Sequence, residues 1–130
     1  MLLLARNTQK PVLHIAPSYS EDNIMDSCID DLLTNLLKSD INIIVRPHPQ
    51  YIRRNPDKIA AFKERHAKEL AAEEFIFQTD FSSNNDVFSS DILITDWSTI
   101  AFEYSFTTKH PTLFINTKMK VINLEYNTPF

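Results

Sequence analysis

The stretch VLHIAPSYSEDNIMDSCIDDLLTNLLKSDINIIVRPHP, residues 12–49, decides the fold class. Its first five residues are a short apolar run that ends before a proline, which is typical of a buried strand. Two adjacent rows of apolar residues, each spaced by four, then predict one helix with a wide apolar face over residues 24–38. The β-branched run at 41–45 predicts a second strand. A strand, a helix and a strand in this order indicate two parallel strands joined by a crossover helix.

The rest of the chain repeats this alternation of strands and helices. Asn55 and Pro56 predict a helix start, because asparagine caps helices and proline fits the first helical position. Later segments predict a strand at 75–77, a turn at 82–85, a strand at 92–95, a helix at 98–106 and a strand at 112–115. Five apolar strands between helices predict an α/β fold: a Rossmann-like, doubly wound parallel sheet in one domain spanning residues 1–130. We expect strand order 3-2-1-4-5, with the topological switch between the first and fourth strands.

The composition restricts the classes of function. A length of 130 residues allows one buried core but no second ordinary domain, and 43% hydrophobic with 23% charged residues is ordinary for a globular protein. The net charge of −4 argues against nucleic acid as a partner. The chain has no glycine, which excludes the glycine-rich phosphate loops of many nucleotide-binding proteins. A bound phosphate therefore has to be held by other groups.

Other features of the sequence concern location and metal binding. No apolar run approaches the roughly 20 residues of a membrane-spanning helix, and the first residues lack the features of a signal peptide. The single cysteine, Cys28, cannot form an internal disulfide, which fits a reducing compartment. We therefore expect a cytoplasmic protein. Cys28 and the four histidines show no metal-ligand spacing, so we expect no metal site, and no cofactor is expected either.

Three polar segments follow predicted strands at the edge where such sheets bind ligands. Residues 17–20 follow the first strand, 46–49 the second and 96–99 the fourth. In open α/β sheets, ligands sit beyond the carboxyl ends of the strands, near the topological switch. The convergence of these segments is the main functional signal in the sequence. The candidate contacts from the first loop are Pro17, Ser18 and Tyr19.

The segment Arg46-Pro47-His48-Pro49 has the chemistry of a phosphate site. Each proline restricts the residue before it to an extended conformation, so Arg46 and His48 are held in place before a ligand arrives. A guanidinium group suits a bidentate phosphate contact, and an imidazole can donate to a phosphate oxygen or move a proton. The alternative is a turn bounded by prolines with exposed side chains.

Ser98 and Thr99 begin the predicted helix after the fourth strand. The free N–H groups and the dipole of such a helix start attract an anion, and the two hydroxyl groups can add hydrogen bonds. This arrangement would hold a diphosphate without glycine. The alternative is that Ser98 is only an N-cap. Asp96 is expected to be a turn or capping residue rather than a catalyst.

Glu103 lies further along the same helix, among aromatic residues. A carboxylate that accepts hydrogen bonds from two neighbouring hydroxyl groups suits a ribose or a glycerol, and the alternative is a solvated helix glutamate. Trp97 is expected in the core rather than over a ligand. His14, in the middle of the first strand, is expected to be structural.

Taken in order, these segments resemble one known family. The matching residues are 15–19, 45–49, 90–99, Phe102-Glu103 and Lys109-His110-Pro111. Their order and separation resemble the carboxyl-terminal half of the CDP-glycerol:poly(glycerophosphate) glycerophosphotransferase family over roughly residues 12–127. These bacterial transferases build teichoic acids and related cell-surface polymers, and they resemble two-domain nucleotide-sugar glycosyltransferases of the GT-B type. The family commonly has Asp-Tyr-Ser-Ser where this chain has residues 96–99, and aspartate in place of Glu103.

The resemblance implies a role for each candidate residue. Arg46 would face the donor phosphates, and His48 would be the catalytic residue beside them. Ser98 and Thr99 would cradle the diphosphate, and Glu103 would bind ribose or glycerol hydroxyls. The implied partners are CDP-glycerol or a similar nucleotide-activated donor, the amino-terminal half of a longer two-domain enzyme, and an acceptor that can be lipid-linked at the inner membrane face. The 130 residues would then bind the donor and be inactive alone.

Other classes of function stay open at this point. A receiver-like signalling module suits the length and sheet order, but it needs a phosphoacceptor aspartate after the third strand, where the chain has Asp80. A binding or purely structural domain without catalytic activity also fits the pattern. Among enzymes, glycosyltransferases that use another nucleotide-sugar share the same layout.

Overall fold

The computed structural model describes residues 10–19, 22–79 and 85–115. Five parallel strands form one sheet in the order β3-β2-β1-β4-β5. The strands are β1 (Val12–Ala16), β2 (Asn42–Val45), β3 (Ile76–Phe77), β4 (Ile92–Thr95) and β5 (Thr112–Phe114). This confirms the predicted α/β class and strand order, with the switch point between β1 and β4.

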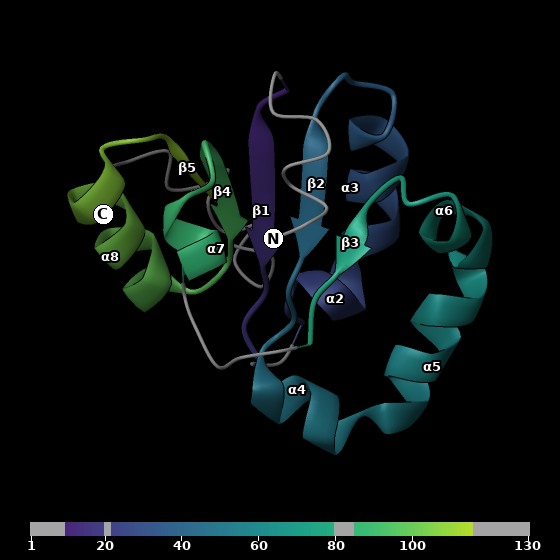
Figure 1. Cartoon of the computed structure of the whole chain (residues 1–130). Helices are drawn as coiled ribbons and strands as arrows, with labels where there is room; N and C mark the ends of the chain where they lie inside the picture. Colours follow the sequence, from purple (N-terminus) through teal and green to yellow (C-terminus); the bar gives the residue numbers. More distant parts are fainter. Residues whose placement is uncertain (1–9, 20–21, 80–84, 116–130) are drawn as a thin grey trace, which may run out of the picture.

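Helices cover both faces of the sheet (Figure 1). They are α2 (Ile24–Ser27), α3 (Ile29–Leu36), α4 (Pro49–Arg54), α5 (Pro56–Arg65), α6 (Ala67–Ala71), α7 (Asn85–Phe88) and α8 (Ser98–Thr108). Figure 1 shows α2, α3, α5 and α6 beside β2 and β3, and α7 and α8 beside β4 and β5. It also shows α4 beyond the arrowhead ends of β1 and β2, where the sheet presents its carboxyl edge.

Strand β1 contributes side chains to two hydrophobic clusters, because successive residues of a strand point to opposite faces. Leu13 and Ile15 pack in the larger cluster, which also contains Leu33 of α3 and Phe62 of α5. Ala16 packs in the smaller cluster with buried residues of α7 and α8. The apolar strands are therefore buried on both sides, as a doubly wound sheet requires.

The helix predicted over residues 24–38 is interrupted at Cys28, so this prediction was wrong in part. Cys28 has φ −146° and ψ 9°, which are not helical values, and it separates α2 from α3. Asn23 caps α2 by accepting the backbone N–H of Asp26 through its side chain at 3.2 Å. The break allows Ile24 of α2 and Leu33 of α3 both to reach the core.

Helix α4 was not predicted, because the sequence interpretation placed the first helix start after the second strand at Asn55. The structure places Pro49 at the first helical position of α4 and His48 at its N-cap, with φ −63° and ψ 143°. His48 is thus extended, as its following proline dictates, but Pro49 turns the chain into a helix. Two basic residues in the last turn also favour this helix. These signals were present in the sequence.

Smaller differences concern the ends of elements. The helix predicted at 98–106 continues to Thr108, and the last strand ends at Phe114. Most of the turn predicted at 82–85 lies outside the described residues. Among the described residues, no helix combines the length and the apolar character needed to cross a membrane.

Candidate functional site

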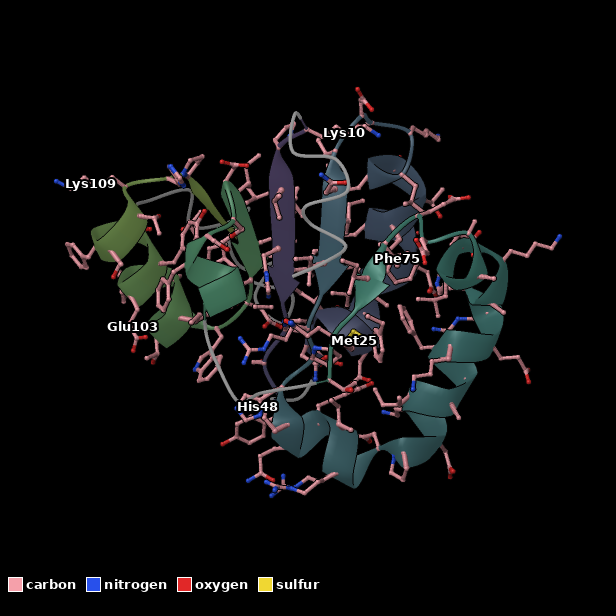
Figure 2. The ribbon with its side chains drawn as sticks, viewed as in Figure 1. Lys10, Met25, His48, Phe75, Glu103 and Lys109 are labelled. Carbon is pink, nitrogen blue, oxygen red and sulfur yellow. The ribbon has the colours of Figure 1, made fainter. Side chains whose placement is uncertain are left out.

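A cavity of about 390 Å³ opens at the carboxyl edge of the sheet, at the switch point between β1 and β4. Its lining comes from all three loops that the sequence singles out, together with α7 and α8. The lining residues are Ala16, Pro17, Arg46, Pro47, His48, Pro49, Val87, Trp97, Thr99, Ile100 and Glu103. Figure 2 places His48 at this end of the sheet and Lys10 at the opposite end. The cavity is large enough for part of a small-molecule ligand.

Arg46 lies in the wall of this cavity and is nearly buried. Its backbone N–H bonds to the carbonyl of Ile15 at 2.9 Å, so the strand pairing of β1 and β2 continues up to this residue. The following proline adds stiffness, and the guanidinium therefore starts from a fixed backbone. A nearly buried guanidinium beside a cavity is suited to an anionic ligand, because its charge is less screened there than at an exposed position.

His48 is held by its backbone and by two aromatic rings. Its Nδ1 accepts the backbone N–H of Gln50 at 3.0 Å, which is the N-cap interaction of α4. The ring centroid of Tyr19 lies 4.4 Å away on one side and that of Trp97 lies 4.9 Å away on another. Burial and the charge of Arg53 lower the pKa of His48 below its usual value. The neutral imidazole therefore carries its proton on Nε2 and presents a hydrogen-bond donor there.

Asp96 connects the loop after β1 with the start of α8. Its carboxylate accepts the backbone N–H of Ser18 at 2.7 Å and the first N–H of α2 at 2.8 Å. Next to it, the Thr95 hydroxyl donates to the carbonyl of Ala16 at 2.6 Å and accepts the backbone N–H of Trp97 at 3.0 Å. Asp96 thus has the capping role that the sequence predicts, although its partners belong to another loop. These bonds fix two walls of the cavity relative to each other.

Helix α8 directs its amino-terminal turn toward the cavity. Thr99 and Glu103 both line the cavity and are exposed, and they lie four residues apart on one face of the helix. Trp97 is the N-cap, its side chain makes no capping hydrogen bond among the described residues, and the first turn contains no acidic residue. The positive end of the helix dipole is therefore not offset locally. Ser98 is the first residue of α8, but its side chain lies outside what the structure describes.

The three loop candidates after β1 have different positions. Pro17 lines the cavity. Ser18 is buried and its backbone is held by Asp96, and it does not belong to the lining. Tyr19 is exposed and contacts the ring of His48 rather than the cavity, with the guanidinium of Arg54 5.8 Å from its own ring centroid. Among the cavity-lining residues, Tyr19 therefore has its ring contact with His48.

Trp97 was expected in the core, and this prediction was wrong. Its side chain is 36% exposed, lines the cavity and contacts His48. As the N-cap of α8 it stands at the rim, because the strand ends at Thr95 and the chain must turn before the helix begins. The position between a strand end and a helix start was the signal that pointed away from the core.

Two remaining expectations concern metals and phosphorylation. Within the described ranges, no three histidine, cysteine, aspartate or glutamate side chains are grouped so that they could hold a metal ion. Asp80, which a receiver-like function would phosphorylate, lies outside the described residues.

Comparison with known proteins identifies the family of this chain. The family described as CDP-glycerol:poly(glycerophosphate) glycerophosphotransferase matches residues 4–121, which include every residue that lines the cavity. No curated protein matches the chain. Because the match spans most of the sequence, the family assignment rests on the whole sheet and not on one motif. The chain belongs to the CDP-glycerol:poly(glycerophosphate) glycerophosphotransferase family, and its type of chemistry is that of a transferase.

Proposed function

We propose that this chain binds the nucleotide-activated donor of a reaction that transfers glycerol phosphate, or a related polyol phosphate, from CDP-glycerol to a hydroxyl group of a surface polymer such as teichoic acid. One observation carries the proposal: a single cavity at the switch point brings together Arg46, His48, Thr99 and Glu103 from separate elements. The family membership supports the same chemistry.

The donor diphosphate would lie between Arg46 and the start of α8. Arg46 offers two parallel N–H groups to one phosphate, and the first turn of α8 offers backbone N–H groups to the other. Thr99 can add a hydroxyl donor. Ser98, the first residue of α8, would add a second one, as the family resemblance implies. This arrangement replaces a glycine-rich loop, which the glycine-free chain cannot form.

His48 would act on the leaving group rather than as the base. Because Nδ1 already accepts the N–H of Gln50, the ring offers Nε2–H to a phosphate oxygen. In the proposed step, the acceptor oxygen forms a bond to the phosphorus of glycerol phosphate, and the bridging P–O bond to CMP breaks with its electron pair leaving on CMP. The acceptor hydroxyl proton goes to a base supplied from outside this set of residues. A donor fixed beside the phosphates stabilises the charge that develops in this step.

Glu103 and Trp97 would select the organic parts of the donor. The Glu103 carboxylate lines the cavity one helical turn beyond Thr99, at a distance from the phosphate position that suits ribose or glycerol hydroxyls. Trp97 offers an exposed aromatic face at the rim, where a pyrimidine can stack.

We propose the same two-part organisation as in GT-B enzymes. Residues 1–130 would form the donor-binding domain, and a second α/β half would provide the acceptor side and the general base. The acceptor is then a growing polymer, which can be lipid-linked at the inner membrane face. The chain alone would bind the donor without turning it over.

The proposal is tested by titrating the chain with CDP, CMP, cytidine and UDP while following backbone amide shifts. We expect CDP to move the amides of Arg46, Gln50 and Thr99, and cytidine alone to leave Arg46 unchanged. A purely structural domain would show no shifts at these residues with any of the nucleotides. Stronger binding of UDP than of CDP would instead favour another nucleotide-sugar donor.

A separate experiment distinguishes the transferase from a receiver-like module. The chain is incubated with acetyl phosphate and Mg²⁺, and the intact mass is measured. We expect no stable acyl phosphate. An added phosphoryl group that is lost in the Asp80→Asn variant would contradict the proposed function.

A further inference from the structure

His14 is a fully buried histidine in the middle of the sheet. It lies in β1 between Ile44 of β2 and Leu93 of β4, which are its partners in the two parallel ladders. Among the described residues, neither its Nδ1 nor its Nε2 has a hydrogen-bond partner. A neutral imidazole contains one donor and one acceptor, so both of its polar groups are unsatisfied here.

His14 lies on the face of β1 that leads to the cavity. Because side chains alternate along a strand, His14 shares a face with Ala16, which lines the cavity. On β2, Arg46 lies two residues beyond Ile44 and on the same face, which makes it the diagonal neighbour of His14. Burial, and after it the charge of Arg46, lowers the pKa of His14 to about 3, so the imidazole is neutral. The two side chains are therefore close and electrostatically coupled.

Packing does not explain a histidine at this position. Both ladder neighbours are apolar and buried, and a leucine of similar size would fill the space without a polar group to satisfy. A buried polar group without a partner destabilises a fold. The unpartnered nitrogens therefore point to a ligand-dependent role.

The chemistry of Arg46 supplies that role. A guanidinium has five N–H donors, and a bidentate phosphate contact uses two of them. The other donors of this nearly buried guanidinium face the protein, and a further acceptor there would fix its plane more firmly. The neutral imidazole of His14 has an acceptor nitrogen that no described residue uses.

We propose that His14 is a positioning residue for Arg46: when a diphosphate binds, an imidazole nitrogen of His14 accepts one N–H of the guanidinium and fixes its plane so that the opposite edge faces the phosphates. The inference deepens the proposed function and rests on it. His14 itself does not contact the donor. This positioning role accounts for a buried imidazole among apolar side chains.

The test compares three variants of the full chain with the unmodified protein. His14→Leu removes the acceptor, His14→Gln keeps one, and Ile44→Leu is the matched control, because it changes packing in the same row of the sheet without removing a polar group. Calorimetry gives the affinities for CDP, inorganic pyrophosphate and cytidine, and thermal unfolding gives the melting temperature.

We expect His14→Leu to melt about 4 °C higher, because it removes an unsatisfied buried group. The same variant should bind CDP and pyrophosphate about 5-fold more weakly, the effect of one hydrogen bond, and cytidine unchanged. His14→Gln should recover most of the lost affinity, and Ile44→Leu should bind as the unmodified chain does. A role in packing alone predicts no selective loss for the ligands that carry a diphosphate.

The outcomes separate this inference from the proposed function. If the unmodified chain binds CDP and His14→Leu binds it equally well, the role of His14 is refuted and the proposed function stands. If the unmodified chain binds pyrophosphate but not CDP, the cytidine donor is refuted, and the pyrophosphate affinities still decide the role of His14. Binding of neither ligand refutes both. A lower melting temperature for His14→Leu also refutes the role of His14, since it would show that the imidazole stabilises the empty protein.

Discussion

Replacing Arg46 by alanine should separate phosphate binding from nucleoside binding. The guanidinium is nearly buried in the cavity wall, so a phosphate bonded to it is shielded from water on one side. Hydrogen bonds to charged groups contribute about 1.5 kcal/mol or more each, and a bidentate contact contains two. The loss of about 3 kcal/mol corresponds to an affinity for CDP that is about 100-fold lower. Cytidine, which has no phosphate, should bind within about 2-fold of its normal affinity, because it forms neither of these bonds.

The assay is isothermal titration of CDP, CMP and cytidine against Arg46→Ala, Arg46→Lys and Arg65→Ala. Arg65 is the matched control, because it is an exposed arginine outside the cavity, paired with Asp30 at 3.2 Å. Arg46→Lys keeps the charge but loses the two parallel N–H donors of the guanidinium. We therefore expect its affinity for CDP to be about 10-fold lower, which lies between the effects of the other two variants. Equal losses for CDP and cytidine in Arg46→Ala would refute the phosphate role. Unchanged melting temperatures would exclude unfolding as the cause.

Three further predictions concern stability. Asp96→Asn should lower the free energy of unfolding by about 1–3 kcal/mol, measured by urea denaturation, because an amide carbonyl cannot satisfy both backbone N–H groups that the carboxylate now accepts. Lys109→Gly should raise it by up to about 1 kcal/mol, because Lys109 has φ 60° and glycine adopts this left-handed conformation without steric cost. Stability should fall as the pH is lowered from 6.5 toward 3, by at most about 1.4 kcal/mol per pH unit from His14, whose pKa is about 3 in the folded chain.

The sign of the pH effect follows from the proton balance. Between pH 6.5 and 3 the unfolded chain protonates His14 while the folded chain does not, so protons favour unfolding. The contribution of His14 to stability is fully present above pH 6.5. The pKa of His48 is lowered as well, so its effect on stability has the same sign. His14→Leu should weaken the dependence of the unfolding free energy on pH. If this variant loses as much stability between pH 6.5 and 3 as the unmodified chain does, the effect does not come from His14. An unchanged free energy of unfolding in Asp96→Asn would contradict the role of its carboxylate as a double acceptor. A lower free energy of unfolding in Lys109→Gly would contradict the argument from its left-handed backbone conformation.

Much of the fold followed from local patterns. Short apolar runs that end before proline or polar residues located the strands, and the alternation with helices gave the parallel order. The general rule for ligand position in such sheets then placed the site at the three loops that do line the cavity. The strand positions and the parallel order were confirmed, because local patterns locate the strands and a general rule for α/β sheets orders them. That the cavity binds a ligand stays a prediction.

The helix boundaries were less predictable. The apolar rows continue through Cys28, but the backbone leaves the helical conformation there. Helix α4 is short, and its start at Pro49 is stabilised by the side chain of His48, which the sequence presented as a ligand-binding residue. A side chain with two possible roles cannot be assigned to one of them from its neighbours alone.

The sequence by itself determined the sheet order, the edge at which a ligand is expected and the residue types available there. Only the tertiary structure decided that Asp96 satisfies backbone groups 72 and 78 residues away and that Trp97 lies at the rim of the cavity. It also decided that the nitrogens of His14 have no hydrogen-bond partner in the part of the chain that the structure describes. The physical reason is that hydrogen-bond satisfaction and burial depend on which distant groups the fold brings within about 3 Å. Local sequence patterns do not specify the distances between groups that are far apart in the chain.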